Sequence, residues 1–203
     1  MTTRLLFPTH LYQSSRSEAD ILSDVEEACW MIEDGDQAGH DWCEEKGYPG
    51  YTSYASLDDL PERAPAFEAL AADLMKHALR FADELHWELP KKGLSLDAIW
   101  VNVLGEGGSH SGHIHPGSVI SGTYYVAVPE GAGDIRFEDP RLAMMMAAPP
   151  LQDEVPDALK RFVYVTPKPG DILMWESWLR HEVMAGRTEE PRISISFNFG
   201  LAG

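Results

Sequence analysis

Apolar and polar positions repeat with a helical period in the first half of the chain and with a strand period in the second. Ser17 and Asp20 resemble a capping box, which predicts a helix that begins here and ends at Gly35. A longer apolar stripe predicts a second helix from Pro65 that ends before Pro90. Between them, the Gly-, Pro- and Tyr-rich segment 47–65 predicts loops and one short helical turn from Ser56.

From residue 98 onward, short runs of β-branched and aromatic residues alternate with turn residues, which predicts strands. The predicted strands are 98–104, 119–128, 134–137, 162–166, 171–175 and 192–199. Because no helix separates them, the pattern predicts an antiparallel sandwich, jelly roll or small barrel with the N-terminal helices packed outside it. The longest segment between two predicted strands, 141–160, has the length of a lid or a mobile loop, and we assign it no role.

Without a linker or a repeat, the chain is expected to form a single domain, 1–203. Residues 1–95 would be a largely helical support layer, and residues 96–203 would be the β core.

The composition narrows the possible partners and the compartment. The chain has 16 basic and 33 acidic residues, a net charge of −17, which would repel nucleic-acid backbones and anionic lipid surfaces. Cys29 and Cys43 lack the spacing of a disulfide framework or a thiolate zinc site. The sequence contains no apolar stretch of 18 residues and no signal peptide. These features predict a cytoplasmic protein that binds neither nucleic acid nor membranes.

The last predicted strand, RISISFNF, alternates perfectly between apolar and polar residues. One interpretation is a sheet with one face on the core and the other in water. The second is a barrel whose polar interior holds a ligand while the apolar face packs outward against the helices. In the second case Arg192, at the head of the polar face, would present a planar fork suited to a carboxylate.

Histidines concentrate in the segment HSGHIHPGSVISGTYYV, residues 110–126. His113 and His115 are two residues apart, so in an extended segment both imidazoles point to one side, as a two-ligand metal arm requires. His181 is the other histidine of the β half and a candidate third ligand. His110 lies in a Gly- and Ser-rich stretch and is interpreted as a solvated loop residue outside the metal site.

The order of these motifs resembles the Fe(II)/2-oxoglutarate-dependent oxygenases, in particular a branch marked by HxHPGSxxSGxYYV and by a late SWxxHxV and RISxSFN. The resemblance spans roughly residues 96 to 200. It implies a double-stranded β-helix, a cupin-like jelly-roll variant, flanked by α-helices. It also implies Fe(II) as cofactor, 2-oxoglutarate as cosubstrate, and decarboxylation of 2-oxoglutarate coupled to hydroxylation of a small-molecule or peptide substrate.

The resemblance also implies roles for individual residues. His113 and His181 would be iron ligands, and Arg192 would pair with the C5 carboxylate of 2-oxoglutarate, assisted by Ser194. Tyr125 matches an aromatic residue that reaches the same carboxylate. Asn102 matches a strand amide that contacts the cosubstrate in some members.

Position 115 departs from the family pattern, which has a carboxylate there. Three arrangements follow: a three-histidine site with His115 as ligand, which we favour, a two-histidine site completed by water, or a carboxylate from Glu138 or Asp139. Two alternative functions also remain open. One is a cupin-like three-histidine enzyme that uses no 2-oxoglutarate, and the other is a non-catalytic ligand-binding jelly roll.

Overall fold

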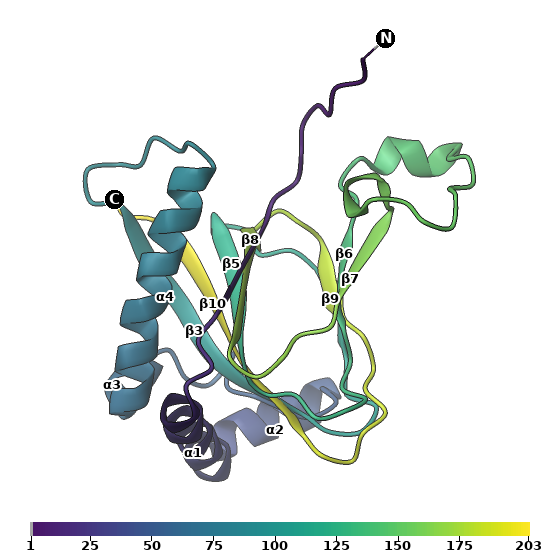
Figure 1. Ribbon diagram of the computed structural model, residues 1–203. Helices are drawn as coiled ribbons and strands as arrows, with labels where there is room; N and C mark the ends of the chain where they lie inside the picture. The colour runs from purple at the N-terminus through teal and green to yellow at the C-terminus, as the bar shows by residue number, and fades with distance from the viewer. Residues whose placement is uncertain (1) are drawn as a thin grey trace.

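Two antiparallel sheets face each other, and helices cover the outer side of the larger one (Figure 1). The structure is a computed structural model that describes residues 2–203, with the side chains of Met144 and Met145 left undescribed. The major sheet has the order β1-β8-β5-β10-β3-β2, and the minor sheet β4-β9-β6-β7. The protein therefore consists mainly of antiparallel strands, as a jelly roll requires.

The strands of the major sheet are β1 (Leu11–Ser15), β2 (Tyr51–Thr52), β3 (Leu94–Leu104), β5 (Ile120–Ala127), β8 (Asp171–Glu176) and β10 (Arg192–Leu201). Those of the minor sheet are β4 (His110–His113), β6 (Ile135–Glu138), β7 (Phe162–Val165) and β9 (His181–Val183). The helices are α1 (Ala19–Gly35), α2 (Gln37–Lys46), α3 (Leu60–Arg63) and α4 (Pro65–Glu84), with 3-10 turns η1 (Leu142–Met146) and η2 (Asp157–Leu159).

The main hydrophobic core lies between the helices and the major sheet. Helix α4 buries Phe67, Leu70, Leu74 and Phe81 in one cluster with the apolar residues of β10. Helix α1 adds Val25, Ala28 and Ile32 to the same cluster. The amphipathic stripes of both helices therefore bury their apolar side against the sheet, which is the main source of stability for such helices.

Strand β10 separates two environments. Its apolar residues Ile193, Ile195, Phe197 and Phe199 belong to the core beneath the helices. Its polar residues Arg192, Ser194 and Asn198 are also buried, at 4%, 2% and 7% exposure, and Ser196 is half-buried, so most of this face is shielded from solvent. The barrel arrangement is thus confirmed for this strand, with the apolar face toward the helices and the polar face toward the interior.

Gly122 in the SGTYYV segment is required by close packing. A Cβ atom there would lie 2.5 Å from the ring of Phe197 and 2.5 Å from the carbonyl oxygen of Leu173. Only glycine leaves room for this approach of β5 to its two neighbouring strands.

Both predicted helices and all six predicted strands are present, with shifted ends. The capping box is wrong: α1 starts after Glu18, which makes no side-chain cap, and Ser17 instead lies against Gly170. The helical turn expected from Ser56 begins later, as α3 at Leu60. Helix α2 and strands β1, β2, β4 and β9 were not predicted, because each is short and lacks a clear apolar period.

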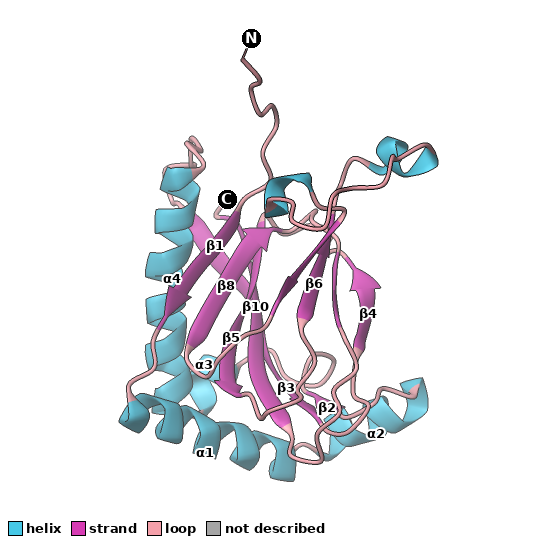
Figure 2. Ribbon diagram, turned by 45° about the vertical axis from the view of Figure 1, so that its right-hand side comes forward, coloured by secondary structure: helices cyan, strands magenta, loops and turns pink. Residues whose placement is uncertain are grey.

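Segment 141–160 extends away from both sheets and contains only the two 3-10 turns (Figure 2). Within residues 2–203, no helix has both the length and the apolar character needed to cross a membrane.

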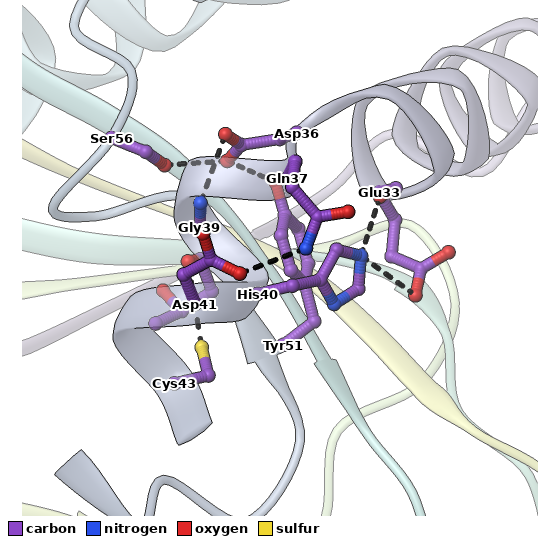
Figure 3. Close-up of polar contacts among 10 residues, drawn as sticks. Glu33, Asp36, Gln37, Gly39, His40, Asp41, Cys43, Tyr51 and Ser56 are labelled. Atoms are coloured by element: carbon purple, nitrogen blue, oxygen red, sulfur yellow. Dashed lines mark hydrogen bonds and ion pairs between the residues drawn. The ribbon is translucent and has the colours of Figure 1, made fainter. Parts of the chain in front are cut away.

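A buried carboxylate joins the helical layer to the edge of the major sheet (Figure 3). Asp36 precedes α2 and accepts hydrogen bonds from the Gly39 backbone N–H at 3.0 Å and the Tyr51 hydroxyl at 2.8 Å. The Ser56 hydroxyl is a third donor. Burial and the nearby Asp36 carboxylate raise the pKa of Tyr51, which keeps its phenol protonated as a donor. Asp36 thereby caps α2 and holds β2 beside β3.

Replacing Asp36 with alanine is expected to lower the free energy of unfolding by about 2–3 kcal/mol, because the helix cap is lost and the buried Tyr51 hydroxyl loses its acceptor. Urea denaturation measures the change. Asp41→Ala is the matched control, since Asp41 lies on the exposed side of the same helix and contacts Gln37. Equal losses in the two variants would contradict the role assigned to Asp36.

Candidate active site

Three histidines meet where the minor sheet opens toward the interior. His113 ends β4 and His181 begins β9, and the two residues are direct partners across the antiparallel pair. His115 follows in the next loop, where its backbone N–H donates to the Ser177 carbonyl at 3.0 Å. One ring nitrogen from each of the three lies within 4.8 Å of the others, a spacing that could hold a metal ion.

Backbone carbonyls orient two of the three rings. Nδ1 of His113 lies 2.7 Å from the Ser111 carbonyl oxygen, and Nδ1 of His181 lies 2.9 Å from that of Leu179. A carbonyl only accepts hydrogen bonds, so each Nδ1 carries the proton and each Nε2 keeps a free lone pair. These rings are therefore set as Nε2 ligands by contacts within two residues in sequence.

Burial keeps all three imidazoles neutral. Desolvation, with a smaller contribution from His113, lowers the pKa of His115 to about 4 and that of His181 to about 3. Desolvation also lowers the pKa of His113. Near neutral pH the cluster consequently offers uncharged nitrogen donors, the form that metals bind.

His110 is not solvated as expected. Its ring stacks on that of His113 with centroids 4.3 Å apart and meets Tyr48 edge-on at 5.8 Å. Desolvation lowers its pKa to about 4. It does not belong to the group of three metal-binding candidates, so it lies beside the site rather than in it.

The two carboxylates considered as alternative ligands have other partners. Glu138 Oε2 accepts from Arg180 Nε at 3.0 Å. Asp139 accepts hydrogen bonds from both Nε and Nη2 of Arg141, at 3.0 and 2.7 Å. Neither belongs to the metal-binding group of the described residues, which is formed by histidines alone.

Arg192 lies deeper in the interior, at the start of β10. Its guanidinium carbon is 5.0 Å from the ring centroid of Tyr125, a cation–π contact. Burial raises the pKa of Tyr125, and the charge of Arg192 and its closeness to the phenol oppose that shift, although the two groups do not reach hydrogen-bond geometry. The hydroxyl of Tyr125 and Nε of Arg192 are buried without a hydrogen-bond partner in the described chain.

Two further buried donors without partners lie near the same interior. They are the hydroxyl of Tyr48, beside His110, and the indole N–H of Trp175, whose ring centroid is 4.5 Å from that of His181. Desolvation raises the pKa of Tyr48 to about 12, and Arg192 opposes this. The sequence had not singled out Tyr48, because no spacing relates the α2–β2 connection to the histidine motif. Buried unpaired donors are uncommon and call for an acceptor.

The other predicted cosubstrate residues are buried close by. Ser194 is 2% exposed and follows Arg192 on the same strand face. The Asn102 side chain already has two protein partners, since it accepts from the Thr52 hydroxyl at 2.9 Å and donates to Ser196 at 3.1 Å. Its remaining capacity for a cosubstrate is therefore one lone pair and one N–H.

A cavity of about 270 Å³ borders the histidine loop. Its lining combines the loop residues from Ile114 to Val119 with Trp87, Trp178 and Glu176. Trp178 is 47% exposed, so the cavity lies at the surface of the protein next to His115.

Residues 98–198, about half of the chain, match the model of a protein family described as "Putative 2OG-Fe(II) oxygenase". The chain belongs to the 2OG-Fe(II) oxygenases. This confirms the resemblance of the histidine and RISxSFN motifs, and it makes the protein an enzyme that uses iron and 2-oxoglutarate. None of the curated protein sequences matches the chain.

Solved structures share the fold of this oxygenase. A prolyl-4-hydroxylase from Pseudomonas putida has a TM-score of 0.63 at 15% identity, covering 96% of this chain and 94% of that one. The epimerase SnoN from nogalamycin biosynthesis has a TM-score of 0.64 at 15% identity, with 95% and 77% covered. HygX from Streptomyces hygroscopicus, solved with nickel and 2-oxoglutarate bound, has a TM-score of 0.60 at 15% identity, with 95% and 83% covered. At these identities the likeness establishes the jelly-roll fold.

The side chains of the site fit both Fe(II) and 2-oxoglutarate. Neutral imidazoles suit divalent iron, although a third histidine leaves the site one charge more positive than two histidines and a carboxylate would. Arg192 and Trp175 can only donate hydrogen bonds, and Tyr125 and Tyr48 can each donate through a hydroxyl, which suits a ligand rich in carboxylate oxygens.

Proposed function

We propose that this oxygenase binds Fe(II) through His113, His115 and His181 and binds 2-oxoglutarate through Arg192, and that it hydroxylates a small-molecule or peptide substrate. The observation that carries the proposal is the set of four buried, unpaired donors beside three convergent imidazoles. Unpaired donors of this kind are costly unless a ligand accepts from them. A dicarboxylate bound next to a metal would satisfy them.

The chain's own residues would hold and orient the reacting groups. Arg192 would pair with the distal carboxylate of 2-oxoglutarate, with Tyr125 and Ser194 as neighbouring donors. When bound, Fe(II) supplies the oxygen chemistry that couples decarboxylation of 2-oxoglutarate to oxidation of a substrate C–H bond. The apolar residues Leu173, Phe137 and Leu179 around the site exclude water and strengthen these polar contacts.

The compartment and the domain organisation are also proposals. We infer a cytoplasmic location from Cys29 and Cys43, which are both free and buried. We treat the helices and the sheets as one domain because one hydrophobic cluster includes residues of α1, α4 and the major sheet, and a second includes residues of the major sheet and of β6.

Succinate formation tests the proposed function. Purified protein is loaded anaerobically with Fe(II), mixed with 2-oxoglutarate and oxygen, and assayed with a panel of amino acids, peptides and small metabolites. We expect succinate in amounts that depend on iron, with stimulation by the true substrate. Stoichiometric metal binding with no binding of 2-oxoglutarate would contradict the proposal and favour a three-histidine enzyme of another chemistry.

Replacing Tyr48 with phenylalanine is expected to weaken 2-oxoglutarate binding about tenfold, because one donor to a charged acceptor is lost while the ring contact with His110 is kept. Anaerobic calorimetry of the metal-loaded protein measures the affinity. Tyr164→Phe is the control, since Tyr164 is 52% exposed and lies on β7. Unchanged affinity in the Tyr48 variant would place its hydroxyl outside the cosubstrate site.

A further inference from the structure

His115 differs from the other two histidines in what its Nδ1 atom contacts. Nδ1 lies 3.3 Å from the side-chain amide of Asn198, whereas His113 and His181 face carbonyl oxygens. An amide can present either its N–H group or its oxygen, and the choice is set by the surrounding hydrogen bonds. The proton position of a neutral His115 ring is therefore decided by Asn198.

Asn198 belongs to a chain of buried hydrogen bonds. The Ser121 hydroxyl lies 2.8 Å from Asn198 Oδ1 and 2.8 Å from the Ser177 hydroxyl. At the other end, His115 Nε2 lies 3.3 Å from His181 Nε2. Ser177, Ser121 and Asn198 are 1%, 1% and 7% exposed, so water does not compete for the contacts among these three residues, whereas His115 is half-buried.

When these hydrogen bonds run from Ser177 toward His115, they leave the site unable to bind a metal. Ser177 donates to Ser121, Ser121 donates to the Asn198 oxygen, and the Asn198 amide nitrogen donates to His115 Nδ1. The one proton of His115 then sits on Nε2 and is donated to the Nε2 lone pair of His181. The Nε2 atoms of His115 and His181, two of the three nitrogens that a metal needs, are then hydrogen-bonded to each other. Every residue of the hydrogen-bond network has a partner.

When the same hydrogen bonds run in the opposite direction, they free the histidine nitrogens to bind a metal. If the Asn198 amide turns by half a rotation, its oxygen accepts from His115 Nδ1–H and its nitrogen donates to Ser121, which donates to Ser177. The lone pair of His115 Nε2 is then free, and so is that of His181. Each hydroxyl can rotate to serve either direction, so both states use the same contacts.

We propose that Asn198, with Ser121 and Ser177, is a positioning switch that reverses when metal binds and so converts His115 from the donor of His181 into the third metal ligand. This inference rests on the three-histidine site proposed above. It assigns Asn198 the task that a fixed carbonyl performs for the other two ligands. Unlike a carbonyl, the amide lets the empty site satisfy itself.

Nuclear magnetic resonance of histidine labelled with nitrogen-15 tests the switch, because the ring-nitrogen shifts distinguish the two neutral tautomers. Spectra are recorded near neutral pH for the metal-free protein and for the protein with Zn(II), which is diamagnetic. We expect the proton of His115 on Nε2 without metal and on Nδ1 with Zn(II). His113 and His181 should keep Nδ1–H in both.

Variants at Asn198 separate the switch from a merely structural role. Asn198→Asp offers only acceptors to His115, so its metal-free form should already carry Nδ1–H. Asn198→Leu removes the contact and should weaken Zn(II) binding by about 10- to 100-fold, the usual cost of losing an outer-sphere partner. Ser196→Ala is the control on the same strand face, where Ser196 contacts Asn102, and it should bind Zn(II) as the unmodified protein does.

The outcomes separate this inference from the proposed function. Zn(II) binding with the proton of His115 unmoved, or unchanged affinity in Asn198→Leu, would overturn the switch and leave the metal site standing. Failure of the unmodified protein to bind Zn(II) at these histidines would overturn both. A reversal seen with Zn(II) stands even if no succinate forms, since the measurement does not use 2-oxoglutarate or oxygen.

Discussion

Replacing His181 with alanine is expected to weaken Fe(II) binding by about 100-fold or more, because a directly coordinating nitrogen is lost where even an outer partner is worth 10- to 100-fold. His181 is 5% exposed and its ring contacts those of His113 and Trp175, so few waters can replace it. Anaerobic calorimetry with Fe(II) measures the affinity, and succinate formation should fall with it.

His10→Ala is the matched control for this prediction, since His10 is exposed in the N-terminal segment. Circular dichroism of the His181 variant shows whether its sheets are intact before metal is added. A folded His181→Ala protein that still binds one equivalent of Fe(II) at full affinity would contradict the assignment of His181 as a ligand.

Replacing Arg192 with methionine is expected to weaken 2-oxoglutarate binding by about 30-fold or more, since removing one member of a buried charge pair costs about 2–5 kcal/mol. Arg192 is 4% exposed and has an unpaired buried Nε. After its removal, no cation from solvent would reach this position to pair with the carboxylate of 2-oxoglutarate. The affinity is measured on protein loaded anaerobically with Fe(II). Metal affinity should change little, which separates this variant from those at the histidines.

Arg187→Met is the control, because Arg187 is exposed in the loop before β10. Arg192→Lys should recover part of the affinity, as a lysine supplies the charge without the planar fork. An Arg192→Met enzyme with unchanged 2-oxoglutarate affinity would indicate that this arginine holds a substrate carboxylate instead.

The parts of the fold that the sequence predicted are those with a strong local signal. The alternation in 192–199 identified the strand and its two faces, because a period of two leaves only two faces to assign, but it left open whether the polar face meets water or the interior. The helix at Pro65–Glu84 was equally clear from its apolar stripe. In contrast, β4 and β9 are short and rich in small or polar residues, and they form because they pair with each other through His113 and His181.

The candidate site was predictable to a similar degree. The spacing of His113 and His115 indicated a ligand arm, but the choice of His181 depended on family resemblance and on its place in the β half. Tyr48 and Asn198 could not be found in the sequence, because they reach the site through tertiary contacts. Tyr48 meets His110 from the connection after α2, and Asn198 reaches His115 across 83 positions.

The two faces of β10 connect the site to the core of this enzyme. Phe197 and Phe199 anchor the strand in the core beneath the helices, whereas Arg192 and Asn198 on the other face contact Tyr125 and His115 of the site. One strand thus carries both the packing that holds the fold and the polar groups of the site, so a shift in its register would disturb the two together.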